Sequence, residues 1–120
     1  MKDYFKYEEI KSHFDDFLTE DSGIDGKSNY FLAINDSDFR DDLHYHAFNT
    51  DYYIIGWSSA VEWLEDEIFN VINIIKEYEQ FHFGEVTTDL SEPEKVVNMY
   101  VYIVGEEIVA EWLENNPLKE

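Results

Sequence analysis

Apolar residues recur at every third or fourth position in several stretches of the chain, which is the spacing that lines one face of an α-helix. The clearest stretch covers residues 68–82 and ends before Gly84, a residue type that commonly terminates helices. A similar stretch covers residues 7–20 and ends before Gly23. The pattern predicts an amphipathic helix over each of these two ranges.

Capping residues indicate two more helices in the middle of the chain. Asp36 is a candidate N-cap for a helix that ends near Asn49. Thr50 is a candidate cap for the next apolar segment, residues 51–64. Gly56 lies inside that segment and predicts either a kink or a helix boundary there.

The C-terminal part of the chain has the strongest helix-start signal. Residues 91–94, Ser-Glu-Pro-Glu, combine an N-cap serine, an early proline and a glutamate three positions after the serine, and predict a helix that ends near Asn115. Residues 96–104 leave this helix almost no polar face, and a helix that is apolar all round is buried. Residues 96–113 are therefore expected to form either the centre of a helical bundle or a homodimer interface.

Two short segments leave room for a β element. Residues 29–34 form an apolar patch that suits a strand or the start of a helix, and residues 85–89 carry a valine and two threonines, which favour strands. Residues 21–29 have the composition of a loop. The sequence predicts a mostly α fold, with one acidic globular domain over residues 1–120 and a compact bundle of four to five helices. Pairing of 29–34 with 85–89 would make an α+β variant with a small two-stranded sheet.

Charge excludes several functions. The chain has 120 residues, with 8 Lys and Arg against 28 Asp and Glu, and a net charge of −20. Nucleic-acid binders that neutralise phosphates and polybasic membrane anchors both need clustered Lys and Arg, so direct binding of nucleic acid or membrane is not expected. Hydrophobic residues make up 44% and aromatic residues 18%, which indicates a folded core rather than a disordered acidic tail.

Cysteine is absent, which excludes a disulfide scaffold, a zinc-thiolate site and a thiol nucleophile. Charges interrupt every apolar run near the N-terminus, whereas a secretory signal has an uninterrupted apolar core. The longest nearly uncharged stretch, residues 52–61, is far shorter than the ~18 residues that suggest a membrane span. A soluble cytoplasmic protein is expected.

Candidate metal and catalytic groups are sparse and incomplete. Glu79 and His82 have the Glu-x-x-His spacing of di-iron bundles, but such sites need two copies, so a surface glutamate and a helix-end histidine are expected. Residues 21–26 are similar to the start of a calcium loop that fails at its third and twelfth positions. Asp42 and His46 are expected to be a surface charge pair rather than a catalytic acid and base. No enzyme activity, cofactor or metal is expected.

Acidic residues recur at helical neighbour spacing, so the predicted helices present ridges of carboxylates. The candidate partner-binding residues are Asp38, Asp41, Asp42, Glu62, Glu65, Asp66, Glu107, Glu111 and Glu114, with Tyr52 and Tyr53 as aromatic anchors. Solubility of a small domain requires a net charge of only about 2–8 in magnitude. A globule of this length is about 35 Å across, and a DNA duplex of that length carries about twenty phosphate charges. The excess acidity therefore predicts a surface that binds a basic, nucleic-acid-binding protein.

The small size, the lack of cysteine, the acidity and the helical pattern resemble the DNA-mimic proteins of phages and mobile elements. That resemblance implies an inhibitor that occupies the positively charged nucleic-acid site of a restriction enzyme or CRISPR effector, in the cytoplasm of the host cell. Residues 48–56, 77–79, 83–86 and 96–99 are also similar to small uncharacterised proteins of phage and plasmid origin. Such proteins supply no catalytic residues to transfer.

Three other functions fit the same composition. An immunity protein or antitoxin that neutralises one basic nuclease toxin is also small, acidic and helical, but it recognises a single partner. A carboxylate-metal enzyme would hold tightly bound, stoichiometric metal. A structural protein of a virion would be found in purified particles.

Overall fold

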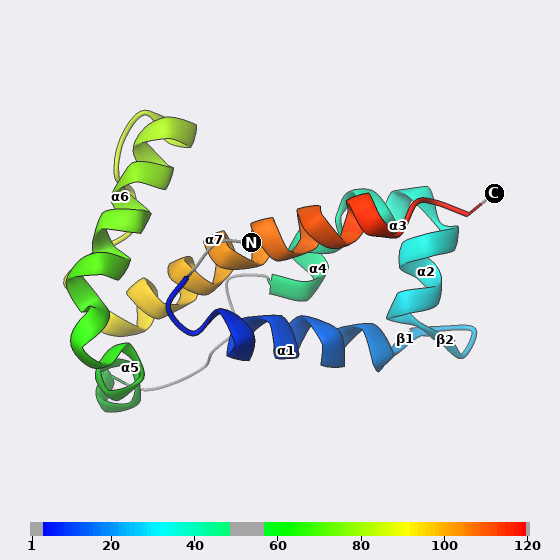
Figure 1. Cartoon of the computed structure of the whole chain (residues 1–120), viewed down its shortest axis with the longest axis horizontal. Coiled ribbons are helices and arrows are strands. Elements are labelled where there is room, and N and C mark those ends of the chain that lie inside the picture. Colours follow the sequence, from blue (N-terminus) through cyan, green and yellow to red (C-terminus); the bar gives the residue numbers. More distant parts are fainter. Residues whose placement is uncertain (1–3, 49–56, 120) are drawn as a thin grey trace. The chain divides into compact units, whose positions relative to one another are not determined.

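The structure, a computed structural model, describes residues 4–48 and 57–119. These residues form two compact units. Unit 1 comprises residues 4–5 and 57–103, and unit 2 comprises the remainder. The fold is mostly α with a small β element, as the sequence predicts, and Figure 1 shows the elements coloured in chain order. The single domain expected over the whole chain stays a prediction.

Helix α1 (Tyr7–Thr19) is the first element of unit 2. Its buried side chains are Tyr7, Ile10, Phe14 and Leu18. Steps of three and four residues place these four side chains on one face, as the apolar spacing predicts. The rest of the helix surface carries all four of its acidic side chains, which are exposed.

A short antiparallel hairpin follows α1 and consists of β1 (Asp21–Ile24) and β2 (Lys27–Ser28). The Ser22 hydroxyl donates a hydrogen bond to the Lys27 carbonyl at 2.8 Å and so links the two strands from the side chain. The small two-stranded element is thus present, but it lies within residues 21–28, which the composition predicts to be a loop. Asp25 and Gly26 form the two-residue turn, with φ of +51° and +69°, and Asp-Gly at this place is a local hairpin signal that loop composition alone does not reveal.

Residues 29–34 belong to helix α2 (Asn29–Asn35) and not to a strand. Ser28 caps this helix, because its hydroxyl oxygen accepts the Phe31 N–H at 3.1 Å. Residues 85–89 are not in a strand either. The pairing of these two segments, which the sequence left open, therefore does not form: the cap and the helical bonds of α2 already satisfy its backbone groups.

The single helix expected from Asp36 to near Asn49 is divided into α3 (Ser37–Asp41) and α4 (Leu43–Phe48). The Asp36 N-cap is confirmed, because one of its side-chain oxygens accepts two backbone N–H groups of the first turn of α3. At Asp42 the backbone leaves helical geometry, with φ −104° and ψ 16°. The division allows α4 to bury three of its six side chains, which are Leu43, Ala47 and Phe48.

Unit 1 contains α5 (Trp57–Leu64), a 3-10 turn η1 (Glu65–Glu67) and α6 (Ile68–Phe83). Helix α6 ends at Gly84, whose φ of +77° is a left-handed conformation that glycine adopts without strain. The clearest helix of the sequence pattern is therefore confirmed together with its terminating residue. The candidate cap Thr50 and the expected kink at Gly56 lie outside the described residues.

Helix α7 (Pro93–Asn115) contributes residues 93–103 to unit 1 and its remainder to unit 2. Its apolar half is buried, as the sequence predicts. Within residues 96–104, six side chains are at most 4% exposed, namely Val96, Val97, Tyr100, Val101, Ile103 and Val104. The homodimer interface through residues 96–113 stays a prediction. Within the described ranges, no helix combines the length and the apolarity needed to cross a membrane.

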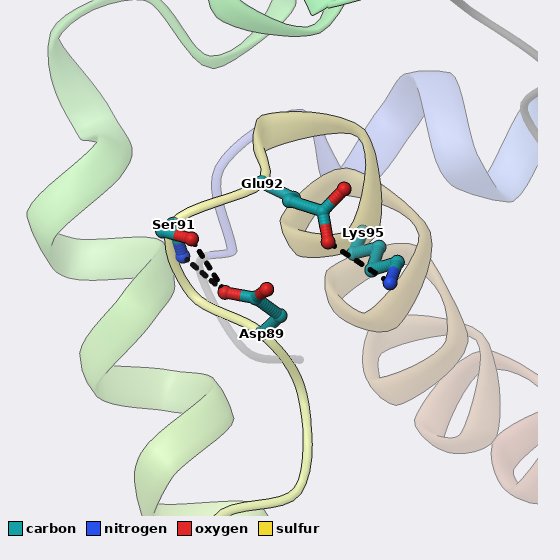
Figure 2. Close-up of polar contacts among 4 residues, drawn as sticks. All are labelled: Asp89, Ser91, Glu92 and Lys95. Carbon is teal, nitrogen blue, oxygen red and sulfur yellow. Dashed lines mark hydrogen bonds and ion pairs between the residues drawn. The ribbon is translucent and has the colours of Figure 1, made fainter.

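Figure 2 shows the turn that precedes α7. The Glu92 carbonyl accepts the N–H groups of Lys95 and Val96, so the helix begins immediately after Glu92. The Ser91 hydroxyl and N–H both donate to the Asp89 carboxylate, at 2.6 and 3.0 Å, and these bonds lower the pKa of Asp89. Ser91 is therefore not the N-cap that the sequence predicts, since Asp89 engages its hydroxyl and the helix starts one residue later.

Candidate partner-binding surface

The predicted acids are divided between the two units. In unit 2 they are Asp38 and Asp41 on α3, Asp42 after it, and Glu107, Glu111 and Glu114 on α7; in unit 1 they are Glu62 on α5 and Glu65 and Asp66 on η1. All are exposed except Glu107, which is half-buried. The predicted aromatic anchors Tyr52 and Tyr53 lie outside the described residues.

The single arginine of the chain serves the backbone and not the acids. Arg40 donates from Nη1 to the Ala33 carbonyl and from Nη2 to the Leu113 carbonyl, each at 2.9 Å. These carbonyls lie in the last turns of α2 and α7, where a cation is favourable. Two lysine ion pairs each join neighbours on the chain, Lys11 with Asp15 at 3.3 Å and Lys95 with Glu92 at 2.9 Å. With 8 basic against 28 acidic residues, the cations can neutralise only a minority of the acidity.

Acids from two helices of unit 2 influence the pKa of one buried tyrosine. Burial raises the pKa of Tyr7, and the negative charge of Glu111 raises it further. Lys11 opposes this effect, while Glu8 and Glu107 add to it. Since Glu8 lies on α1 and the other two glutamates lie on α7, the carboxylates of both helices act on the same place.

We call this part of unit 2 the α1/α7 acidic surface, consisting of Glu8, Asp15, Glu107, Glu111 and Glu114. The three carboxylates on α7 follow one another at four and three residues, about 6 and 4.5 Å along the helix axis. Phosphates of one DNA strand follow at about 3.4 Å along the duplex axis. The row on α7 is thus sparser than a DNA strand, but its spacing is of the same order.

A hollow of about 170 Å³ lies between α1 and α7 within this surface. Its walls include the rings of Tyr7, Phe14 and Trp112 and the carboxylates of Asp15 and Glu111. The Trp112 ring meets the Phe14 ring edge to face, with centroids 5.9 Å apart. Sequence reasoning identified Glu111 but missed the hollow, because the residues that form it come from opposite ends of the chain.

Glu79 is buried, with 1% of its surface exposed, and the surface position expected from the sequence is wrong. Its Oε1 accepts the N–H groups of Thr87 and Thr88 at 2.9 and 3.0 Å, and its Oε2 accepts their hydroxyls at 3.3 and 2.6 Å. Burial alone raises the pKa of Glu79, but these hydrogen bonds outweigh burial and hold the pKa below its ordinary value. Glu79 therefore ties the loop after α6 back to the helix. The adjacent threonines were the sequence signal that could have indicated this role.

His82 does not share a site with Glu79, although the two residues have the Glu-x-x-His spacing. His82 is exposed, and the centroid of its ring lies 4.1 Å from the centroid of the Tyr78 ring. Residues 4–48 and 57–119 contain no group of three or more His, Asp or Glu side chains that could hold a metal ion. The Glu-x-x-His spacing therefore pairs a buried carboxylate that holds a loop with a histidine on the surface.

Asp42 and His46 are connected through the backbone, where the Asp42 carbonyl accepts the His46 N–H at 2.9 Å. The His46 ring stacks on Phe39, with centroids 4.5 Å apart and planes 12° from parallel. Both residues are exposed. This geometry orients the imidazole toward an aromatic ring, which is not the arrangement of an acid and base pair.

No protein-family model matches this chain, and neither does a curated protein or a solved structure. The resemblance to DNA-mimic proteins therefore rests on composition and helical pattern.

Proposed function

We propose that the chain is a DNA-mimic inhibitor, which occupies the positively charged nucleic-acid site of a restriction enzyme or CRISPR effector and blocks access of DNA or RNA. The observation that carries this proposal is the α1/α7 acidic surface, where two helices contribute five carboxylates and Lys11 is already paired with Asp15. In this proposal the chain binds neither nucleic acid nor membrane, uses no cofactor and acts in the cytoplasm of a phage host.

The energetics support a cationic partner. Like charges one turn apart on a helix each cost a few tenths of a kcal/mol, and a net charge of −20 opposes the compact state. A basic cleft offsets that repulsion when it binds the acidic surface. Association is then steered by long-range attraction, and it weakens steeply as salt screens the charges.

The test is competition with DNA. Purified protein is titrated into a panel of restriction, CRISPR and recombination enzymes bound to labelled duplex, at low salt. The proposal expects displacement of DNA from at least one enzyme, and loss of that displacement by about tenfold or more in the triple variant E107Q/E111Q/E114Q.

A control variant removes the same number of charges elsewhere on unit 2. D16N/E20Q/D25N alters three exposed acids outside the α1/α7 acidic surface. This control variant should still displace most of the DNA, since only the long-range electrostatic attraction is reduced. Absence of competition with every enzyme of the panel would count against the proposed function, and equal losses in both triple variants would count against the assigned surface.

A second function, an immunity protein or antitoxin for one basic nuclease toxin, is favoured by a different observation. Phe81 and Phe83, at the end of α6, are 84% and 54% exposed. Exposed aromatic side chains often act as anchors in specific protein interfaces. Charge complementarity alone does not require them, whereas a single cognate partner provides pockets for them.

The double variant F81A/F83A separates the two functions. An immunity protein should lose neutralisation of its toxin by about thirtyfold or more, because a truncated anchor costs about 2 kcal/mol. A DNA mimic should keep its competition with DNA within about threefold. Phe69→Ala is the matched control, since Phe69 is 77% exposed on the same helix but far from its C-terminal end.

A further inference from the structure

The hollow in the α1/α7 acidic surface has the size of a single side chain. Its volume is about 170 Å³, whereas sites for drug-sized ligands measure about 300–1,000 Å³. It lies entirely within unit 2, between α1 and the C-terminal part of α7. Its occupant is therefore a small group, such as the end of one side chain from a partner.

The walls of the hollow combine aromatic rings with carboxylates. Tyr7, Phe14 and Trp112 supply the rings, and Trp112 is held in place by edge-to-face contacts with Phe14 and with Tyr30, whose centroid lies 6.0 Å away. Asp15 supplies one carboxylate. Aromatic faces attract cations, and a carboxylate beside them adds charge-assisted hydrogen bonds.

Glu111 supplies the second carboxylate, which is available to a ligand. In the described part of the chain its side chain makes no hydrogen bond or ion pair, while Lys11, the cation that lines the hollow, is bonded to Asp15 at 3.3 Å. The influence of Glu111 on the pKa of Tyr7 indicates that its negative charge reaches the wall of the hollow. An incoming cation therefore finds uncompensated negative charge.

Two asparagines complete the rim in fixed orientations. Asn115 donates through Nδ2 to the Glu111 carbonyl at 3.1 Å, and Asn116 donates through Nδ2 to the Trp112 carbonyl at 2.8 Å. Each bond occupies one of the two N–H donors of its amide, and the amide oxygen keeps its capacity to accept a hydrogen bond. A rim of oxygen acceptors suits a ligand that only donates.

We infer that this hollow receives the guanidinium group of one arginine from the basic partner. The planar guanidinium stacks on aromatic rings, donates to several acceptors at once and carries a positive charge, and it has no acceptor of its own. That the arginine belongs to a nucleic-acid-handling protein rests on the proposed function. The affinity of the hollow for a guanidinium group is a property of this chain alone.

The probe is N-acetyl-arginine amide, titrated into the full-length ¹⁵N-labelled protein. The indole N–H signal of Trp112, assigned with a Trp112→Phe variant, should shift and saturate with a dissociation constant in the range of about 1 mM. N-acetyl-citrulline amide has the same shape without the charge, and should bind at least about tenfold more weakly. N-acetyl-lysine amide should bind more weakly than the arginine probe.

Glu111→Gln should weaken binding of the arginine probe by about tenfold, because it removes the charge that pairs with the guanidinium. Asp16→Asn is the control, since this exposed acid on α1 does not line the hollow, and it should change binding less than about twofold. Circular dichroism checks that both variants keep their helices.

Equal binding of the arginine and citrulline probes, absence of a Trp112 shift, or full binding by Glu111→Gln would each overturn the assignment of the hollow. These outcomes leave the proposed function intact if the wild-type protein still displaces DNA from an enzyme. Conversely, arginine binding without any DNA displacement supports the hollow and rejects the DNA-mimic role.

Discussion

Glu79 differs from the other carboxylates of the described residues in being buried and fully hydrogen-bonded. Its four bonds come from Thr87 and Thr88. In Glu79→Gln one carboxylate oxygen becomes an NH2 group, which donates and cannot accept hydrogen bonds from these donors. We therefore expect the free energy of unfolding to fall by about 1–3 kcal/mol. Urea denaturation measures this change. Glu77→Gln, at an exposed position on the same helix, should change stability by less than about 0.5 kcal/mol.

The same carboxylate predicts a pH dependence with a definite sign. Hydrogen bonds hold the pKa of folded Glu79 below that of the unfolded chain, so the ionised group stabilises the fold at neutral pH. This stabilisation is lost as the pH falls through the lowered pKa. The stability difference between wild type and Glu79→Gln should therefore be constant near neutral pH and shrink in acid. A difference that grows in acid would contradict this role.

Gly105 on α7 lies against the ring of Phe48. A Cβ atom at this position would lie 2.5 Å from two ring carbons, which is closer than such atoms pack. Alanine in a helix normally stabilises by about 1 kcal/mol relative to glycine. We expect Gly105→Ala to destabilise instead, by about 1–3 kcal/mol, because the Phe48 ring must move within a packed core.

Thermal unfolding gives the sign of this effect. In the double variant Gly105→Ala/Phe48→Leu the smaller side chain leaves room for the new methyl group, so the two changes together should cost less than the sum of their separate costs. Stabilisation by Gly105→Ala alone would show that the ring is not the constraint.

Arg40 connects three helices of unit 2. It belongs to α3, and its two terminal nitrogens donate to carbonyls in α2 and α7. Arg40→Lys keeps the charge but reaches only one of these carbonyls, so we expect a loss of about 1–3 kcal/mol in the free energy of unfolding. Arg40→Gln, which also removes the charge, should lose at least as much. Wild-type stability in the lysine variant would mean that the forked geometry is unimportant.

The whole molecule is predicted to be stabilised by salt. Its charge of −20 repels itself in the folded state, and the screening length falls from about 30 Å at 0.01 M to about 3 Å at 1 M salt. The midpoint of thermal unfolding should rise by on the order of 5 °C over this range, which corresponds to about 1 kcal/mol. Differential scanning calorimetry in sodium chloride measures the rise.

A variant with less repulsion is the control for the salt effect. D16N/E20Q/D25N carries three fewer negative charges, so it should be more stable than wild type at low salt and respond less to added salt. An identical salt response would indicate a general solvent effect rather than charge screening. Binding to a basic partner should depend on salt in the opposite direction.

The sequence by itself determined the long helices and the polarity of the surface. Helices α1 and α6 depend on apolar spacing and on end signals a few residues away, such as Gly84 after α6, whereas α7 depends on the start signal around Pro93. Net charge is a sum over residues and needs no structure. The burial of the apolar half of α7 could also be predicted from the sequence, because a helix without a polar face is unfavourable in water.

Only the tertiary structure decided where single side chains lie relative to distant ones. The break at Asp42 lets α4 bury its own side chains, and the burial of Glu79 depends on how the following loop folds back. The hollow requires α1 and the end of α7 to meet, which brings Lys11 and Trp112 together from opposite ends of the chain. Local sequence patterns predict the conformation of neighbouring residues. These features instead arise from packing between segments that are far apart along the chain, and such packing produces no periodic pattern in the sequence.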